Sequence, residues 1–239
     1  MEIQIDKVQK DIHVYRHEEK YYISKVRAFE LSCLLKGCMK KDEHTDADGS
    51  YWIRSLYFDD YTNKDYLDKE SGISERKKLR LRIYNSTTKS VKLELKNKYG
   101  IYMLKESATI SSNDAKLLIA GESSNLLNYD SAVAAKVYYL MHKALYQPKI
   151  LIDYEREAYT YPFENIRVTI DKNIRASNID FNIFKDNINM FPIVEGEVHV
   201  LEVKYNNMFP EFLQKLISTY SVNRSSVSKY CLGRQAISR

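Results

Sequence analysis

Two neighbouring segments within residues 76–98 alternate so regularly that they limit the possible folds of this chain more than any other feature. Charged and apolar residues take turns along each segment, and the short polar stretch 85–89 between them predicts a turn. Because successive side chains of a strand point to opposite faces, the segments predict a β-hairpin with one apolar and one cationic face. A surface hairpin with solvated charges would show the same pattern. The cationic face carries Lys78, Arg80, Arg82, Tyr84, Lys92, Glu94, Lys96 and Lys98.

The same alternation recurs before and after this hairpin, and this recurrence makes a purely solvated surface less favoured. It predicts further strands at residues 14–23, 51–59, 102–110, 149–158, 165–171 and 197–205. The chain therefore contains about eight strands, most of them with an apolar face and a face rich in Lys and Arg.

Four segments between the strands have the spacing and the end signals of helices. They lie at residues 25–41, 111–121, 131–146 and 210–220. Ser24 is predicted to cap the first helix, whose apolar stripe is predicted to contain Val26, Phe29, Leu34 and Leu35. Since no repeat or linker interrupts the pattern, we predict one α+β domain over residues 1–239, with a core of about 14–233.

Composition excludes several classes of protein. Charged residues make up 29% and hydrophobic residues 44% of the chain, as in soluble globular proteins. The three cysteines form neither a paired framework nor a CxxC pattern, and the five histidines show no metal-binding spacing. No apolar run approaches the roughly 20 residues that cross a bilayer, and the N-terminus lacks a signal-peptide core. We therefore expect a cytoplasmic protein without a zinc site or a membrane segment.

Periodicity shows that each strand has two faces, but it does not show which face is enclosed. A two-sheet sandwich would bury the apolar faces and leave the cations in water. A barrel with helices packed outside would instead enclose the cations in a polar lumen. About ten cations in one lumen would repel one another and lose hydration unless a polyanion lay among them. A barrel would therefore indicate a ligand built of phosphates.

Short motifs of the chain resemble, as an ordered set, those of a known family. They are Arg16-x-Glu18-x-Lys20-Tyr21, Ser55-Leu56-Tyr57-Phe58-Asp59, Lys78-Leu79-Arg80-Leu81-Arg82-x-Tyr84, Glu94-Leu95-Lys96, Lys105, Tyr154-x-Arg156-x-Ala158-Tyr159, Arg167-Val168-Thr169-Ile170-Asp171, Leu201-Glu202-Val203-Lys204-Tyr205 and Ser228-Lys229-Tyr230. The set resembles the VTC family of polyphosphate polymerases, a branch of the triphosphate tunnel metalloenzyme (CYTH-like) superfamily.

The resemblance implies an antiparallel, eight-stranded, tunnel-like β-barrel with a basic lumen and helices packed outside. It implies transfer of the γ-phosphate of ATP to a growing polyphosphate chain, with Mn²⁺ or Mg²⁺ as cofactor. The catalytic residues that it implies are Arg80, Arg82, Lys96, Arg156 and Arg167. The phosphate-binding residues would be Lys20, Lys78, Lys105, Tyr154, Lys204, Ser228 and Lys229. Glu202 would bind the metal, with Glu18 and Glu94 as lesser candidates, whereas Ser107 stands where a further basic residue is expected.

Two other functions stay open, a triphosphatase of the same fold and a polyphosphate-binding module without activity. Tunnel triphosphatases begin with Glu-x-Glu-x-Lys, whereas this chain has Arg16, Glu18 and Lys20. The arginine favours holding an anionic acceptor over polarising water, unless it merely forms a surface ion pair. ATP and polyphosphate are the expected partners. Nucleic acid is not expected, because no aromatic stacking platform or basic tail is present. No feature indicates an oligomeric state.

Overall fold

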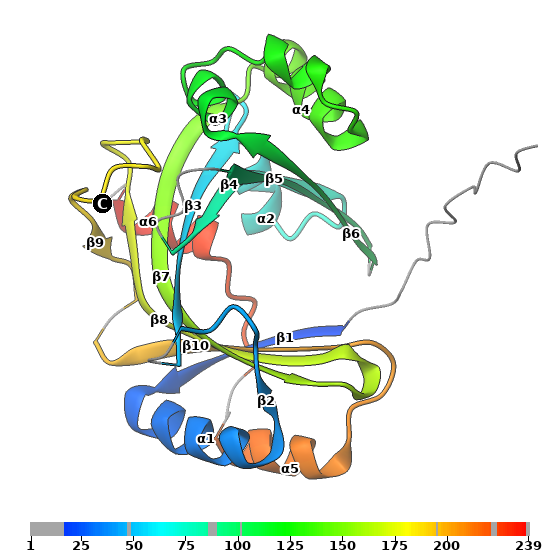
Figure 1. The fold of residues 1–239 in the computed structure, drawn as a ribbon, viewed down its shortest axis with the longest axis vertical. Coiled ribbons are helices and arrows are strands. Elements are labelled where there is room, and N and C mark those ends of the chain that lie inside the picture. Colours follow the sequence, from blue (N-terminus) through cyan, green and yellow to red (C-terminus); the bar gives the residue numbers. More distant parts are fainter. Residues whose placement is uncertain are drawn as a thin grey trace, which may run out of the picture.

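Eight antiparallel strands follow one another across a single curled sheet in the order β1-β10-β8-β7-β3-β4-β5-β6 (Figure 1). This computed structural model describes residues 17–46, 49–85, 90–100, 102–194, 196–220 and 224–237. The strands are β1 (His17–Ser24), β3 (Tyr51–Asp59), β4 (Arg76–Tyr84), β5 (Ser90–Tyr99), β6 (Tyr102–Ser111), β7 (Gln147–Tyr161), β8 (Ile166–Ser177) and β10 (Val198–Tyr205). Two-residue strands, β2 (Lys40–Lys41) and β9 (Phe191–Pro192), pair with β7 and β8.

The helices form two groups at opposite ends of the molecule, and one further pair lies between them (Figure 1). They are α1 (Lys25–Cys38), α2 (Lys64–Glu70), α3 (Ser112–Ile119), α4 (Ala132–Lys143), α5 (Glu211–Tyr220) and α6 (Lys229–Ile237), with short 3₁₀ turns η1 (Ser124–Asn128) and η2 (Phe163–Asn165). Helices α3 and α4 cover one end of the outer surface, and α1 and α5 lie side by side on the other. None of the helices in the described residues is long and apolar enough to span a membrane.

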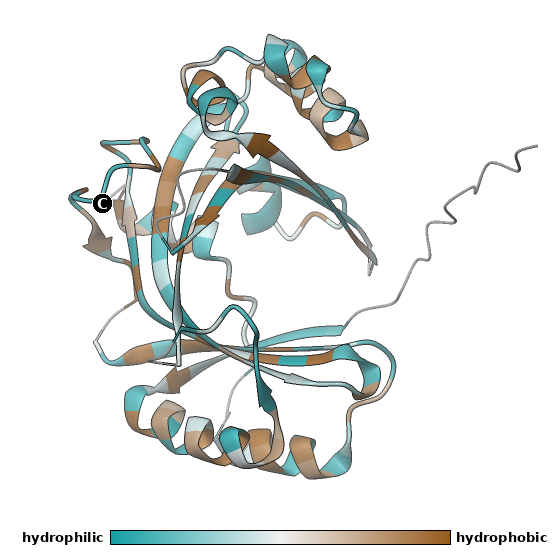
Figure 2. Cartoon of the chain, viewed as in Figure 1, coloured by the Kyte–Doolittle hydropathy of each residue, from teal (hydrophilic) through white to brown (hydrophobic). Residues whose placement is uncertain are grey.

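The two-faced hairpin predicted at residues 76–98 is confirmed as β4 and β5, and its apolar face lies on the outside under helices. Teal and brown segments alternate along the strands (Figure 2), as this arrangement requires. The outer core at this end combines the hairpin residues Leu79, Leu81, Ile83, Val91, Leu93 and Leu95 with Ala115 and Leu118 of α3 and Val137 of α4. The apolar faces thus need the helices for burial, which excludes a two-sheet sandwich.

The first helix begins where the sequence predicts, but its buried stripe is different. The Ser24 hydroxyl accepts a hydrogen bond from the Arg27 backbone N–H at 3.4 Å, so the predicted cap is confirmed. Val26, Phe29 and Leu34, predicted to be buried, are instead 64%, 67% and 45% exposed. The face that contacts the sheet is made of Ala28, Leu31, Ser32 and Leu35. The polar Ser32 can be buried there because its hydroxyl forms hydrogen bonds with Glu157 and Tyr159.

The predicted α+β fold, with an antiparallel tunnel-like sheet and helices outside, is confirmed, with two differences. Strands β1 and β6 are the two ends of the strand order, and no pairing joins them among the described residues, so the curled sheet is not closed. Helix α6, which the sequence analysis does not predict, packs against the concave face. Its Tyr230 stacks on Tyr57 with ring centroids 5.3 Å apart and donates a hydrogen bond to Asp59 at 2.5 Å. Gly233 of the same helix lies against Ile150 and Ala176.

Candidate functional site

The concave face of the sheet borders a cavity of about 2190 Å³. Seventeen of its described lining residues are Lys or Arg, and two, Glu18 and Glu202, are carboxylates. The cations come from β1, β2, β4, β5, β6, β7, β8, β10, α2 and α6, and from Arg224 before α6, so they surround one space instead of spreading over the surface. Such a concentration of like charge in a partly enclosed space favours binding of a polyanion. This cavity is called the tunnel below.

The tunnel brings together nearly all of the residues that the sequence analysis selects. Those that line it are Arg80, Arg82, Lys96, Arg156, Arg167, Lys20, Lys78, Lys105, Tyr154, Lys204, Ser228, Lys229, Glu202 and Glu18. Glu94 is 2% exposed and lies beneath this lining, in contact with Arg80 and Lys105. Ser107 is exposed and directly opposite Glu94 on the edge strand β6. Arg16 lies outside the described residues.

Glu94 holds three cations in position at one side of the tunnel. Its Oε2 is 2.6 Å from both Nε and Nη2 of Arg80 and 3.9 Å from Nη1 of Arg82, and its Oε1 is 2.5 Å from Nζ of Lys105. Burial alone would raise the pKa of Glu94, but these cations outweigh it and hold the pKa well below its usual range. Glu94 is therefore ionised and fixes the guanidinium of Arg80 from behind.

Two tyrosines and a serine complete this side. The Tyr57 hydroxyl accepts from Nη1 of Arg80 at 3.0 Å, while Arg82 donates to Ser55 Oγ and to the Tyr154 hydroxyl, both at 3.1 Å. Burial would raise the pKa of Tyr57, but the nearby Arg80, Arg82 and Lys78 lower it to about 8. Tyr57 and Ser55 are thus parts of the arginine arrangement that the sequence analysis does not assign. Their alternation along β3 is the signal that places both on the concave face.

Asp171 plays the corresponding part on the opposite side. Its two carboxylate oxygens accept from Nε and Nη2 of Arg156 at 2.6 and 2.8 Å, and Oδ2 also accepts from Nζ of Lys229 at 2.5 Å. Burial would raise the pKa of Asp171, but Arg156 and Lys229 lower it to about 2. Asp171 belongs to one of the sequence motifs, but no role is predicted for it. The sequence does indicate that Asp171 faces the tunnel, because it lies two residues after Thr169 and four after Arg167 on the same face of one strand.

Glu202 and Glu18 form a third group, in which the carboxylates share their lysines. Lys20 Nζ is 2.6 Å from Glu18 and 3.6 Å from Glu202, and Lys204 Nζ is 3.1 Å from Glu202 and 3.9 Å from Glu18. Arg156 Nη2 also approaches Glu202, at 3.7 Å. Burial opposes ionisation of Glu202, but Lys204, Lys20 and Arg156 hold its pKa well below the ordinary value. The two carboxylates are therefore neighbours.

Several donors in the tunnel are incompletely satisfied by the protein. Lys96 has no hydrogen-bond or ion-pair partner among the described residues, and burial, followed by the charges of Arg80 and Lys204, lowers its pKa well below the ordinary value. Burial also lowers the pKa of Lys78, to about 8, although its Nζ donates to Ser228 Oγ at 2.8 Å. Arg167 bonds to Tyr51 at 2.8 Å and to Asp42 at 2.9 Å, but its buried Nε lacks a partner, as does Thr169 Oγ1. Phosphate oxygens would satisfy such groups.

A metal ion could be held here only together with a bound phosphate. Within the described part of the chain, no group of three or more His, Cys, Asp or Glu side chains could hold a metal by itself. Glu18 and Glu202 are adjacent, whereas Glu94 is engaged by a different set of cations. Mg²⁺ and similar ions commonly use one or two carboxylates together with substrate phosphates. The Glu18–Glu202 pair fits that donor set.

Comparison with known proteins gives a family and a fold. A family model described as the VTC domain matches residues 15–238. No curated protein matches the chain. A crystal structure described as "a putative adenylate cyclase" from Bacillus halodurans is similar over 90% of this chain and 95% of that chain, with 16% identity and a TM-score of 0.51. A structure from Pyrococcus horikoshii OT3 is similar over 94% of this chain and 100% of that chain, with 15% identity and a TM-score of 0.49.

Proposed function

The chain belongs to the VTC domain family, and from this premise we propose that it is a polyphosphate polymerase, which transfers the γ-phosphate of ATP to a growing polyphosphate chain. The observation that carries the proposal is the tunnel itself, in which seventeen cations face two carboxylates. A polyanion matches the charge of this lining, to which nine strands and the helices α2 and α6 contribute among the described residues.

Phosphoryl transfer needs mainly alignment of the reacting groups and neutralisation of their charge. Arg80 and Arg82 on one wall, and Arg156 and Arg167 on the other, supply planar donor groups that suit phosphate oxygens. Glu94 and Asp171 hold Arg80 and Arg156 in place before any ligand arrives, so little reorganisation accompanies binding. Lys96 has no hydrogen-bond or ion-pair partner in the described part of the chain, and its ammonium group would attract the bound phosphates.

Mn²⁺ or Mg²⁺ is the cofactor that we propose. Glu202 and Glu18 would hold it together with phosphate oxygens of the substrate, and when bound it would neutralise charge on those oxygens. Lys20 and Lys204, which now contact both carboxylates, would then be available to the phosphate chain.

The scarcity of carboxylates supports transfer to phosphate over transfer to water. Hydrolysis needs groups that hold and orient a water molecule, and the two carboxylates among the described lining residues are those that the proposed metal ion would occupy. Binding of an anionic acceptor chain, by contrast, becomes more favourable with every additional cation. A triphosphatase remains the second candidate, because it would use the same triphosphate contacts.

We place the protein in the cytoplasm, where ATP is available. The cysteines Cys33, Cys38 and Cys231 are all free, which suits a reducing compartment.

The test is to incubate the pure protein with ATP and Mn²⁺ and to resolve the products on a gel stained for polyphosphate. The proposal predicts ADP and a ladder of long chains. Orthophosphate without a ladder would identify a triphosphatase, and binding of tripolyphosphate without turnover would identify a binding module. An Arg80→Ala protein, assayed in parallel, controls for contaminating activity.

A further inference from the structure

Tyr57 of β3 lines the tunnel, and its hydroxyl is only partly satisfied by the protein. The oxygen accepts a hydrogen bond from Nη1 of Arg80 at 3.0 Å. Because the hydroxyl is the acceptor in that bond, its own O–H is left to donate, and it has no acceptor among the described residues. The side chain is buried, and a buried donor is unfavourable unless a ligand or a water molecule supplies the acceptor.

The groups around this hydroxyl favour an anionic acceptor. The charged and titratable groups near it are Lys20 of β1 with its partners Glu18 and Glu202, Lys78, Arg80 and Arg82 of β4, Glu94 of β5 behind Arg80, Tyr154 of β7 beside Arg82, Tyr230 of α6 and Asp59 of β3. Glu94 accepts from Arg80 and Asp59 accepts from Tyr230, so neither accepts from Tyr57. Burial raises the pKa of Tyr57, but the cations of β4 lower it to about 8.

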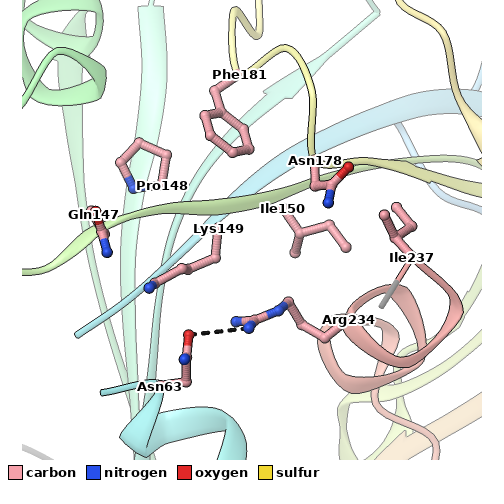
Figure 3. Close-up of a pocket in the computed structure, with 9 residues that line it drawn as sticks. All are labelled: Asn63, Gln147, Pro148, Lys149, Ile150, Asn178, Phe181, Arg234 and Ile237. Atoms are coloured by element: carbon pink, nitrogen blue, oxygen red, sulfur yellow. Dashed lines mark hydrogen bonds between the residues drawn. The ribbon is translucent and has the colours of Figure 1, made fainter. Parts of the chain in front are cut away.

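The ring that carries the hydroxyl is held in place by α6. Tyr57 stacks on Tyr230, with ring centroids 5.3 Å apart. The Tyr230 hydroxyl donates to Asp59 at 2.5 Å and accepts from Nη1 of Arg234 at 3.0 Å. Arg234 in turn donates from Nη2 to Asn63 Oδ1 at 3.1 Å (Figure 3). The Tyr57 hydroxyl therefore has a defined position before any ligand arrives.

We infer that the Tyr57 hydroxyl donates a hydrogen bond to an oxygen of the phosphate chain that the tunnel binds. The inference rests on the proposed function, since it adds a ligand contact to the proposed phosphate site. A hydroxyl that donates to an ionised phosphate oxygen forms a charge-assisted hydrogen bond, which is stronger than one between neutral groups. Such a bond would give Tyr57 the acceptor that the described residues lack.

The contact should depend on pH, because a phenolate has no proton to donate. The negative charge of a bound phosphate opposes ionisation of Tyr57, so the complex holds this proton more tightly than the free protein does. The contribution of Tyr57 to binding is therefore complete below about pH 8 and is lost as the pH rises above that value.

Calorimetric titration with tripolyphosphate, without metal and at constant ionic strength, tests the inference. Tyr57→Phe keeps the ring but removes the O–H, and at about pH 7 it should weaken binding by about 10-fold, as expected for loss of a hydrogen bond to a charged group. At about pH 9 the two affinities should converge. Lys78, whose pKa is lowered to about 8, and the ligand itself titrate with both proteins, so the ratio of the two affinities isolates Tyr57.

Tyr139→Phe, at an exposed position of α4, is the matched control and should bind as the wild type does at each pH. Thermal melting, followed by circular dichroism, checks that each fold is retained. With ATP in place of tripolyphosphate, the same loss in Tyr57→Phe would place the contact at phosphates of the nucleotide. Without such a loss, the contact would lie on the path of the polyphosphate.

The near-ultraviolet absorbance of tyrosinate supplies a second measurement. Near pH 8, one tyrosine fewer should ionise in Tyr57→Phe than in the wild type, and tripolyphosphate should suppress this ionisation in the wild type. The inference is overturned if the wild type binds tripolyphosphate and folded Tyr57→Phe has the same affinity, or if the ratio of affinities does not change with pH. Failure of the wild type to bind tripolyphosphate would instead overturn the proposed function, and the inference with it.

Discussion

Arg156 and Asp171 form a two-point ion pair inside the tunnel wall, with Nε–Oδ1 and Nη2–Oδ2 distances of 2.6 and 2.8 Å. The residues are directly opposite each other on β7 and β8, and they are 6% and 0% exposed. The pairing fixes the plane of the guanidinium, so that its remaining N–H donors point to a defined part of the tunnel.

Asp171→Asn should destabilise the protein by on the order of 3 kcal/mol, because it removes the buried carboxylate that both Arg156 and Lys229 contact. Urea unfolding measures the effect. Glu211→Gln, which breaks the exposed pair with Lys215, is the control and should change the free energy of unfolding by less than about 0.5 kcal/mol. Equal effects of the two substitutions would contradict the structural role of Asp171.

Arg80→Ala should lower the rate of polyphosphate synthesis by on the order of 100-fold, as loss of an electrostatic group does in other enzymes. The substitution removes the guanidinium that Glu94 and Tyr57 hold at the tunnel surface. Steady-state rates with ATP and Mn²⁺ give the measurement. Arg175→Ala, at an exposed position of β8, should retain the wild-type rate. A near-normal rate for the folded Arg80→Ala protein would remove Arg80 from the reaction.

Glu202→Gln should nearly abolish metal-dependent turnover while the fold persists, since it keeps the size of the side chain but removes its charge. Turnover is measured over a range of Mn²⁺ concentrations, and circular dichroism reports the fold. Glu30→Gln, at an exposed position of α1, serves as the control. If Glu202→Gln responds to Mn²⁺ as the wild type does, Glu202 does not bind the metal.

The contribution of Asp65 to stability should fall as the pH rises from about 4 to 7. This carboxyl is 1% exposed and accepts a hydrogen bond from the Tyr146 hydroxyl at 2.7 Å. Burial, with a further contribution from Asp59, raises its pKa from 3.8 to about 7. Since the folded protein holds this proton more tightly than the unfolded chain, ionisation between these pH values favours unfolding. Asp65→Asn cannot ionise, so its melting temperature relative to that of the wild type should increase as the pH rises over this range.

The control for Asp65 is Asp186→Asn, at an exposed position, which should leave the pH dependence unchanged. Melting curves of the three proteins at several pH values measure how the melting temperature of each depends on pH. Parallel pH profiles for wild type and Asp65→Asn would show that Asp65 does not hold its proton in the folded state.

Gly233→Ala should destabilise the protein by about 1–3 kcal/mol through overpacking. A Cβ at this position would lie 2.7 Å from Ile150 Cδ1 and 3.3 Å from Ala176 Cβ, where α6 meets the concave face. Gly37→Ala is the matched control in α1, because a Cβ there meets nothing within 4 Å. It should be neutral or stabilise by up to about 1 kcal/mol. Urea unfolding distinguishes the two outcomes, and equal stabilities would contradict the close packing of α6.

The sequence by itself determined which residues share a face. Side chains alternate along a strand whatever surrounds it, so Arg80 and Arg82 had to lie opposite Leu79 and Leu81. Local patterns also located β3 at its observed bounds, and the preference of serine for helix N-termini located the Ser24 cap. In α1 the local pattern was not enough, because the apolar residues allow two stripes. Contact with the sheet selected the one that contains Leu31.

The tertiary structure alone decided which face is enclosed and which partners meet there. Alternation is a property of a single strand, whereas the order β1-β10-β8-β7-β3-β4-β5-β6 depends on contacts between segments far apart in the chain. That order puts Asp171 against Arg156 and joins Glu18 to Glu202 through shared lysines. It also leaves room on the concave face for α6, whose first residues, Lys229 and Tyr230, line the tunnel. Local periodicity carries no information about such pairings, since they are set by the register and curvature of the assembled sheet.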